Sequence, residues 1–167
     1  MRARLMIVLL LGVTLVFFFA RHWFSDERAV ERVLHSLAEG ARASRAEPGR
    51  TRLARVAKLL DDATTPTVLV HAVDLPPASS GRAGLLEWAA LLDGVDDASF
   101  ELVDLRVVIE GRRAAAHSDV KFEAHIGSDE WTDRRPVAFH LQKDDGRWRV
   151  RSIDVGARPN DWPEARP

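Results

Sequence analysis

The sequence contains neither cysteine nor tyrosine among its 167 residues. The absence of cysteine excludes disulfide bonds, a lipoprotein cleavage site and metal sites built from thiolates. The sequence also lacks an H-E-x-x-H zinc motif, an EF-hand loop, a G-x-S-x-G nucleophile elbow and a glycine-rich phosphate loop. We therefore expect no bound metal ion and no cofactor.

An excess of positive charge is lacking as well. The formal net charge is −1 at pH 7, and without Arg2 and Arg4 the chain has 22 basic residues against 25 acidic ones. Domains that bind nucleic acid usually carry a basic patch or stripe. The composition therefore predicts no nucleic-acid partner.

The sequence does contain a long apolar segment at its start. Residues 5–20 carry no charge and are followed by Arg21. A helix needs about 20 residues to cross a hydrocarbon core of about 30 Å, and the segment reaches that length when it is counted through Phe24. A secretory signal peptide needs small residues just before its cleavage site, and Phe18 is too large for that position. We expect an uncleaved signal anchor at residues 1–24, in preference to a cleaved signal peptide or a buried core helix.

The orientation of this anchor depends on the basic residues that flank it. Arginines lie on both sides of the segment in nearly equal number, so the positive-inside rule gives little preference. A four-residue tail that contains two arginines favours a cytoplasmic N-terminus. We therefore expect a single-pass membrane protein in contact with the bilayer through residues 5–24, with its C-terminal domain in the periplasm or outside the cell.

Residues 25–155 form one further domain, followed by a flexible, proline-rich tail at residues 156–167. Apolar residues recur first with the helical period and then with the alternation of strands. Expected helices begin near residue 25 or 26 and run to residue 41, then cover residues 51–65 and 82–92. Expected strands cover residues 67–74, 99–109, 114–126, 136–143 and 147–155, with a polar loop at 127–133.

The alternation within the expected strands also predicts which side chains share a face. The strand at residues 99–109 puts Val103 on the same face as Leu105, Val107 and Ile109. The last strand puts Trp148 and Val150 on one face, and Ile153 and Val155 on the other. Helices followed by a run of strands indicate an α+β fold, with helices packed on one face of a curved antiparallel sheet.

Two stretches of this chain resemble the NTF2-like superfamily, including its SnoaL-like and ketosteroid-isomerase-like groups. One is the final hairpin, residues 139–154 (FHLQKDDGRWRVRSID), and the other is the pair of strands joined at Gly111-Arg112. The resemblance covers roughly residues 26–155. It implies a cone-shaped domain, in which a strongly bent sheet wraps around helices and leaves a pocket between them.

The resemblance leaves the activity open, because the superfamily includes enzymes, transport factors and assembly proteins. The ketosteroid-isomerase type of site uses a tyrosine as an oxyanion donor, and this chain has none. A single span before a domain of this fold is similar to inner-membrane scaffold subunits of type IV secretion machines. We expect a non-catalytic binding or scaffold module of the bacterial envelope that binds a protein partner or a small apolar ligand. The alternative is a SnoaL-like isomerase or hydrolyase, and the fold also allows a sheet-to-sheet homodimer.

The candidate catalytic residues lie on two of the expected strands. His117 and Asp119 belong to the polar face of residues 114–126, and His140 alternates with apolar residues farther on. Histidine acts as a general base near neutral pH, and a carboxylate can orient it. A solvated sheet face with alternating charges is the simpler explanation of the same pattern.

Three further residues are candidates for binding. His71 lies within an otherwise apolar strand and Trp88 on an expected helix, so both are candidates to line a ligand pocket. Packing in the core is the commoner role of such residues. Trp131 is surrounded by acidic residues in the expected loop, which indicates a contact with a partner protein.

Overall fold

The computed structural model describes residues 26–73, 81–91 and 95–157. The predicted anchor at residues 1–24 and most of the predicted tail lie outside these ranges. Within them, no helix has both the length and the apolar character needed to cross a bilayer.

The described residues form three helices, close to the predicted positions. They are a first helix at residues 26–40, α2 (Gly49–Ala63) and α3 (Gly81–Leu91). The first helix buries Val30 and Leu34, which are four residues apart and therefore share one face. It passes so close to α2 that a Cβ atom on Gly40 would overlap the Leu59 side chain.

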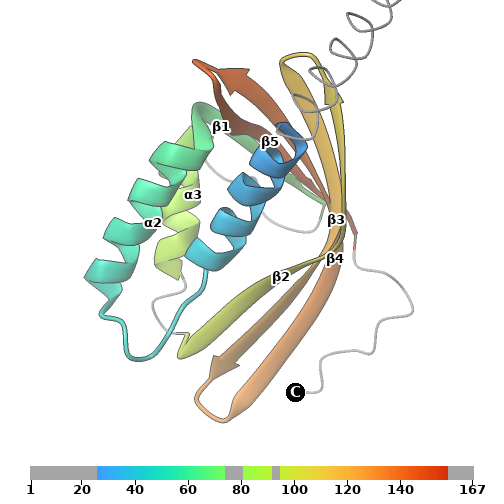
Figure 1. The fold of residues 1–167 in the computed structure, drawn as a ribbon. Helices are drawn as coiled ribbons and strands as arrows, with labels where there is room; N and C mark the ends of the chain where they lie inside the picture. Colours follow the sequence, from blue (N-terminus) through green and yellow to red (C-terminus); the bar gives the residue numbers. More distant parts are fainter. Residues whose placement is uncertain (1–25, 74–80, 92–94, 158–167) are drawn as a thin grey trace, which may run out of the picture.

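Five strands of the described residues form one sheet in the order β1-β5-β4-β3-β2. Their bounds are β1 (Thr64–Ala72), β2 (Asp97–Glu110), β3 (Arg113–Ile126), β4 (Asp129–Asp144) and β5 (Arg147–Val155). The expected antiparallel pairing is confirmed for β2 to β5 and is wrong for β1, which pairs with β5 in parallel. The sheet bends around the helices, which cover its concave face (Figure 1).

The first strand begins three residues earlier than predicted, at Thr64 instead of residue 67. The prediction treated Pro66 as the end of the preceding helix. β1 is an edge strand of this sheet. Proline is tolerated in an edge strand, because a residue on the open side of the strand has no neighbouring strand to which its N–H would donate.

A β-bulge in β2 changes which side chains face the helices. The pairing of β2 with β3 shifts between Val103 and Arg106, and Asp104 has a positive φ of 54°. The irregularity reverses the alternation, so that Leu102 packs against the core in place of Val103. The predicted inward position of Val103 is therefore wrong.

A second irregularity lies in β5, where Arg151 is an extra residue between two β4 partners. Leu141 pairs with Val150, but the next residue, His140, pairs with Ser152. As a result Ile153 and Val155 pack against the same core as Trp148 and Val150. The prediction that these two pairs face opposite sides is wrong for the same reason as in β2.

The predicted loop at residues 127–133 is much shorter in the structure. Gly127, with a φ of 62°, and Ser128 form a tight turn, and β4 begins at Asp129. Trp131 therefore lies on a strand, opposite Ala124 of β3. The turn at Asp145-Gly146 is confirmed, with positive φ at both residues.

Candidate functional site

The inner face of the sheet is covered by apolar packing. Val30 and Leu34 of the first helix meet Phe139, Trp148 and other buried residues of the sheet. The acid/base residues predicted for an interior pocket do not belong to this cluster. The described part of the interior is therefore a hydrophobic core.

The outer face of the sheet carries most of the ionisable residues that the sequence singled out. Cross-strand pairing places Arg106 beside His117, His117 beside Ala138, Ala138 beside Asp154, and Asp154 beside His71. We call these five residues the outer row. Adjacent strands are about 4.8 Å apart, so the outer row extends about 19 Å across the sheet.

The outer row crosses a groove of about 890 Å³, which we call the large groove. All five residues of the row line it, together with the bulge residue Asp104 and Gly156 at the end of β5. Its floor contains the small side chain of Ala138, which leaves room between the longer side chains around it.

The three candidate catalytic residues do not converge on one point. Asp119 accepts a hydrogen bond from Arg134 Nη2 at 2.6 Å, so this carboxylate is engaged by an arginine. His140 Nε2 lies 3.3 Å from Asp154 Oδ2, one strand away from His117. Both histidines are exposed. Thus His117, Asp119 and His140 lie on the same face of adjacent strands, but no hydrogen bond or ion pair joins any two of them.

The predicted binding residues also differ in their positions. His71 is exposed on the outer face and lines the large groove, instead of an interior pocket. Val68 on the same strand faces the core, and the alternation along β1 turns His71 the other way. Trp88 lies on α3, but its side chain is outside the described part of the structure. Trp131 is 50% exposed on β4.

The rest of the polar face of β3 is a surface of paired charges. Lys121 Nζ lies 2.6 Å from Glu123 Oε1. The hydrogen bond between them lowers the pKa of Glu123 and raises the pKa of Lys121. This half of the outer face therefore matches the solvated, alternating charges that the sequence allowed as the simpler explanation.

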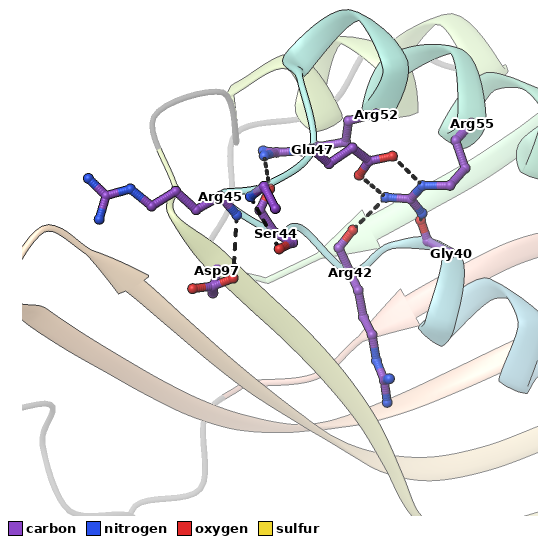
Figure 2. A network of polar contacts seen from close by, with 9 residues as sticks. Gly40, Arg42, Ser44, Arg45, Glu47, Arg52, Arg55 and Asp97 are labelled. Atoms are coloured by element: carbon purple, nitrogen blue, oxygen red, sulfur yellow. Dashed lines mark hydrogen bonds and ion pairs between the residues drawn. The ribbon is translucent and has the colours of Figure 1, made fainter.

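A second polar network joins the end of the first helix to α2 (Figure 2). The Arg55 guanidinium donates hydrogen bonds to both carboxylate oxygens of Glu47, at 2.9 and 2.8 Å, and to the carbonyl oxygens of Gly40 and Arg42. The bond from Arg55 lowers the pKa of the Glu47 carboxyl. The network fixes the chain beside Ala43, which forms a β-bridge with Ala98 of β2. We assign it a structural role.

The sequence reasoning missed two arginines on the outer face, Arg113 and Arg151. They line a smaller groove of about 410 Å³ beside the large one, together with His71, His140 and Asp154. Alternation from Trp148 and Val150 already turns Arg151 outward, but only the strand pairing brings it close to His140 and Asp154. Among the described residues, no group of three or more histidines and carboxylates is arranged to hold a metal ion.

Solved structures share this fold. An NTF2-like protein with a cystatin-like fold from Novosphingobium aromaticivorans aligns with a TM-score of 0.65 at 13% identity, over 89% of this chain and 92% of its own. A candidate dehydratase of the NTF2-like family from Streptomyces avermitilis aligns with a TM-score of 0.63 at 16% identity, over 81% of this chain and 97% of its own. A candidate scytalone dehydratase from N. aromaticivorans aligns with a TM-score of 0.64 at 12% identity, over 84% of this chain and 97% of its own.

No family model matches the sequence, and no curated protein matches it. At such low identities the structural likeness concerns the fold alone. The domain therefore has an NTF2-like α+β fold, and its function has to be inferred from its own residues.

Proposed function

We propose that this protein is a membrane-anchored, non-catalytic binding module of the cell envelope, and that the outer face of its sheet is the binding surface. One observation supports this more than any other. The ionisable candidates and the large groove lie on the outer face, whereas the buried side chains of the described core cluster are apolar.

The same arrangement argues against the isomerase or hydrolyase alternative. Acid/base catalysis requires groups that converge on one substrate, in a site from which water is largely excluded. His117 and His140 are exposed, and Asp119 is engaged by Arg134. Ser152 lies opposite His140 in the strand pairing, but no hydrogen bond joins them, so the pair provides no activated nucleophile among the described residues.

The outer face has features of a protein-binding surface. Leu69, Val73 and Val108 are 42%, 70% and 57% exposed, although all three are apolar. They lie around a centre of small side chains that includes Ala115 and Ala138. Apolar side chains are thus exposed on both edge strands of this face, and polar and charged residues line the groove between them. The proposed binding surface is therefore the outer face of the sheet, where apolar side chains lie among polar and charged ones.

The membrane location rests on the apolar segment at residues 5–20. Asp26 follows the proposed anchor by two residues. Its Oδ1 atom accepts hydrogen bonds from Lys143 Nζ at 2.6 Å and from Trp148 Nε1 at 3.2 Å. These bonds hold the start of the domain against the β4–β5 hairpin, so we infer that this hairpin lies nearest the bilayer. The proposed partner is then another protein of the same membrane or compartment.

Site-specific photo-crosslinking in the native membrane tests this proposal. A photoreactive residue at position 138 occupies the large groove, and one at position 62 lies on the exposed side of α2 as a matched control. We expect a discrete protein adduct from position 138 and none from position 62. Equal labelling from both positions, or a small molecule retained in the interior of the purified protein, would contradict the proposal.

A further inference from the structure

The smaller groove of about 410 Å³, which we call the arginine groove, has an unusual balance of charge. Arg113 and Arg151 line it, and neither forms a hydrogen bond or ion pair through its side chain with another described residue. Its one carboxylate, Asp154, lies 3.3 Å from His140 Nε2. Two guanidinium groups therefore face the groove without a carboxylate partner.

Two other arginines of the same sheet are neutralised by neighbouring carboxylates. Arg134 pairs with Asp119 at 2.6 Å, and Arg135 pairs with Asp133 at 2.8 Å. Glu110 lies opposite Arg113 in the pairing of β2 with β3, yet no ion pair joins them. Arg113 and Arg151 therefore differ from Arg134 and Arg135, which are held by carboxylates.

The strand pairing extends the positive charge beyond the groove itself. Arg113 lies beside Gln142, and Gln142 lies beside Arg149, so the two arginines are separated by two strand spacings, about 10 Å. The Nε atom of Arg149 is buried and has no hydrogen-bond partner among the described residues. Arg113 and Arg149 therefore flank Gln142, whose amide donates a hydrogen bond to Asp144 Oδ1 at 2.8 Å.

The β5 bulge explains why the groove is formed here. The extra residue at position 151 interrupts the alternation between Val150, which faces the core, and Ser152, which pairs with His140. Arg151 would face outward in a regular strand as well, but the extra residue also turns Ser152 and Asp154 outward, so that all three line the groove.

We propose that the arginine groove binds carboxylate side chains of an acidic segment of the partner protein. This inference rests on the proposed function, because it uses the same outer face. Guanidinium groups bind carboxylates through paired, charge-assisted hydrogen bonds. The exposed side chain of Leu69 lies beside Ser152. An apolar residue of the partner's acidic segment would cover it, so we expect this segment to carry apolar residues between its acidic ones.

A protein segment fits this surface better than a long polyanion. The chain as a whole carries a net charge of −1. Ion pairs and carboxylates cover much of the remaining outer face, including Glu123 and Asp119. A continuous polyanion would meet this negative charge, whereas a short acidic segment contacts only the arginine groove and the apolar residues next to it.

Peptide binding to the full-length protein in uncharged detergent micelles tests the inference. The probes are fluorescein-labelled (Glu-Leu)4 and (Gln-Leu)4, and fluorescence anisotropy measures the binding, with empty micelles as the blank. We expect the acidic peptide to bind and the neutral peptide to bind at least about tenfold more weakly, because charged hydrogen bonds are lost.

Two charge-reversal variants provide the comparison. Arg113→Glu/Arg151→Glu should weaken the binding of (Glu-Leu)4 by at least about tenfold. Arg50→Glu/Lys58→Glu makes the same change of charge at exposed positions of α2 and should leave the affinity unchanged. The arginine-to-lysine double variant at 113 and 151 should be intermediate, because lysine keeps the charge but lacks the planar fork. Circular dichroism verifies that each variant is folded.

Several results would overturn the inference. Equal weakening by both charge reversals would show a general effect of net charge. Failure of (Glu-Leu)4 to bind, while position 138 still gives a protein adduct in membranes, would refute the acidic segment and leave the proposed function intact. Transfer of a photoreactive label at position 152 to lipid instead of protein would identify a membrane contact in its place.

Discussion

Replacement of Phe139 by alanine tests the division between a packed inner face and a solvated outer face. Phe139 is 8% exposed and lies between Ala116 of β3 and Ile153 of β5 in the strand pairing. Removal of a buried phenylalanine side chain costs about 3–5 kcal/mol, because apolar contacts are lost and a cavity remains. Because Phe139 retains some exposure, we expect a loss near the lower end, about 3 kcal/mol.

The neighbouring residue provides a matched control. His140 follows Phe139 on the same strand, but its side chain is 51% exposed. His140→Ala should change the free energy of unfolding by about 0.5 kcal/mol or less. Because 1 kcal/mol shifts the melting temperature of a domain of this size by about 3 °C, Phe139→Ala should melt about 9 °C below the wild type.

Thermal unfolding of the full chain in detergent, followed by circular dichroism, measures both variants. A urea titration at fixed temperature gives the free energies directly. The reasoning is refuted if His140→Ala destabilises the protein as strongly as Phe139→Ala. It is also refuted if Phe139→Ala lowers stability by less than about 1 kcal/mol, which is well below the cost of truncating a buried phenylalanine.

Three further predictions follow from other contacts. Ala116→Leu overpacks a fully buried position and should cost about 1–3 kcal/mol, whereas Ala138→Leu on the outer face should leave the melting temperature unchanged. Asp26→Asn weakens the contact of the first helix with Lys143 and Trp148 and should cost about 2 kcal/mol by urea unfolding, in contrast to Glu27→Gln. In the folded state Arg55 lowers the pKa of the Glu47 carboxyl below its value in the unfolded chain. The ionised carboxylate therefore stabilises the fold at pH values above its unfolded pKa. This stabilisation is lost as the pH falls through the lower pKa of the folded state. The difference in melting temperature between wild type and Glu47→Gln should therefore be present at neutral pH and disappear in acid; an unchanged difference would contradict the bond to Arg55.

The sequence was sufficient to predict the order of the elements and most of their bounds. The helical period of Val30 and Leu34 and the alternation of Val137, Phe139 and Leu141 each reflect burial on one side. These patterns are local, so they can be interpreted without knowledge of the neighbouring strands.

The two bulges could not be predicted in this way. A shift of one residue at Asp104 or Arg151 moves every following side chain to the opposite face, and its position depends on pairing with another strand. The inward position of Leu102 and the outward positions of Ser152 and Asp154 follow from such shifts. The strand pairing is therefore needed to place Ser152 and Asp154 beside Arg151 in the arginine groove.

The position of the candidate site could also be predicted only in part from the sequence. Alternation predicted that His140 and Phe139 point in opposite directions, and this is confirmed. It could not show which of the two faces contains a cavity, because that depends on how well the helices fill the concave side. In the structure Leu34 and Trp148 belong to the apolar core on the concave side, and the large groove lies on the outer face.

Chemical footprinting of histidines is the most direct test of an outer face that binds a partner. Diethyl pyrocarbonate modifies accessible imidazoles, and mass spectrometry measures the extent at each position. We predict that His71, His117 and His140 react readily in the purified full chain and become protected in the native membrane. His35, exposed on the first helix away from this face, should react equally in both and serves as the internal control. Slow reaction of the three histidines in the purified chain, or equal reaction of all four in the native membrane, would contradict the account.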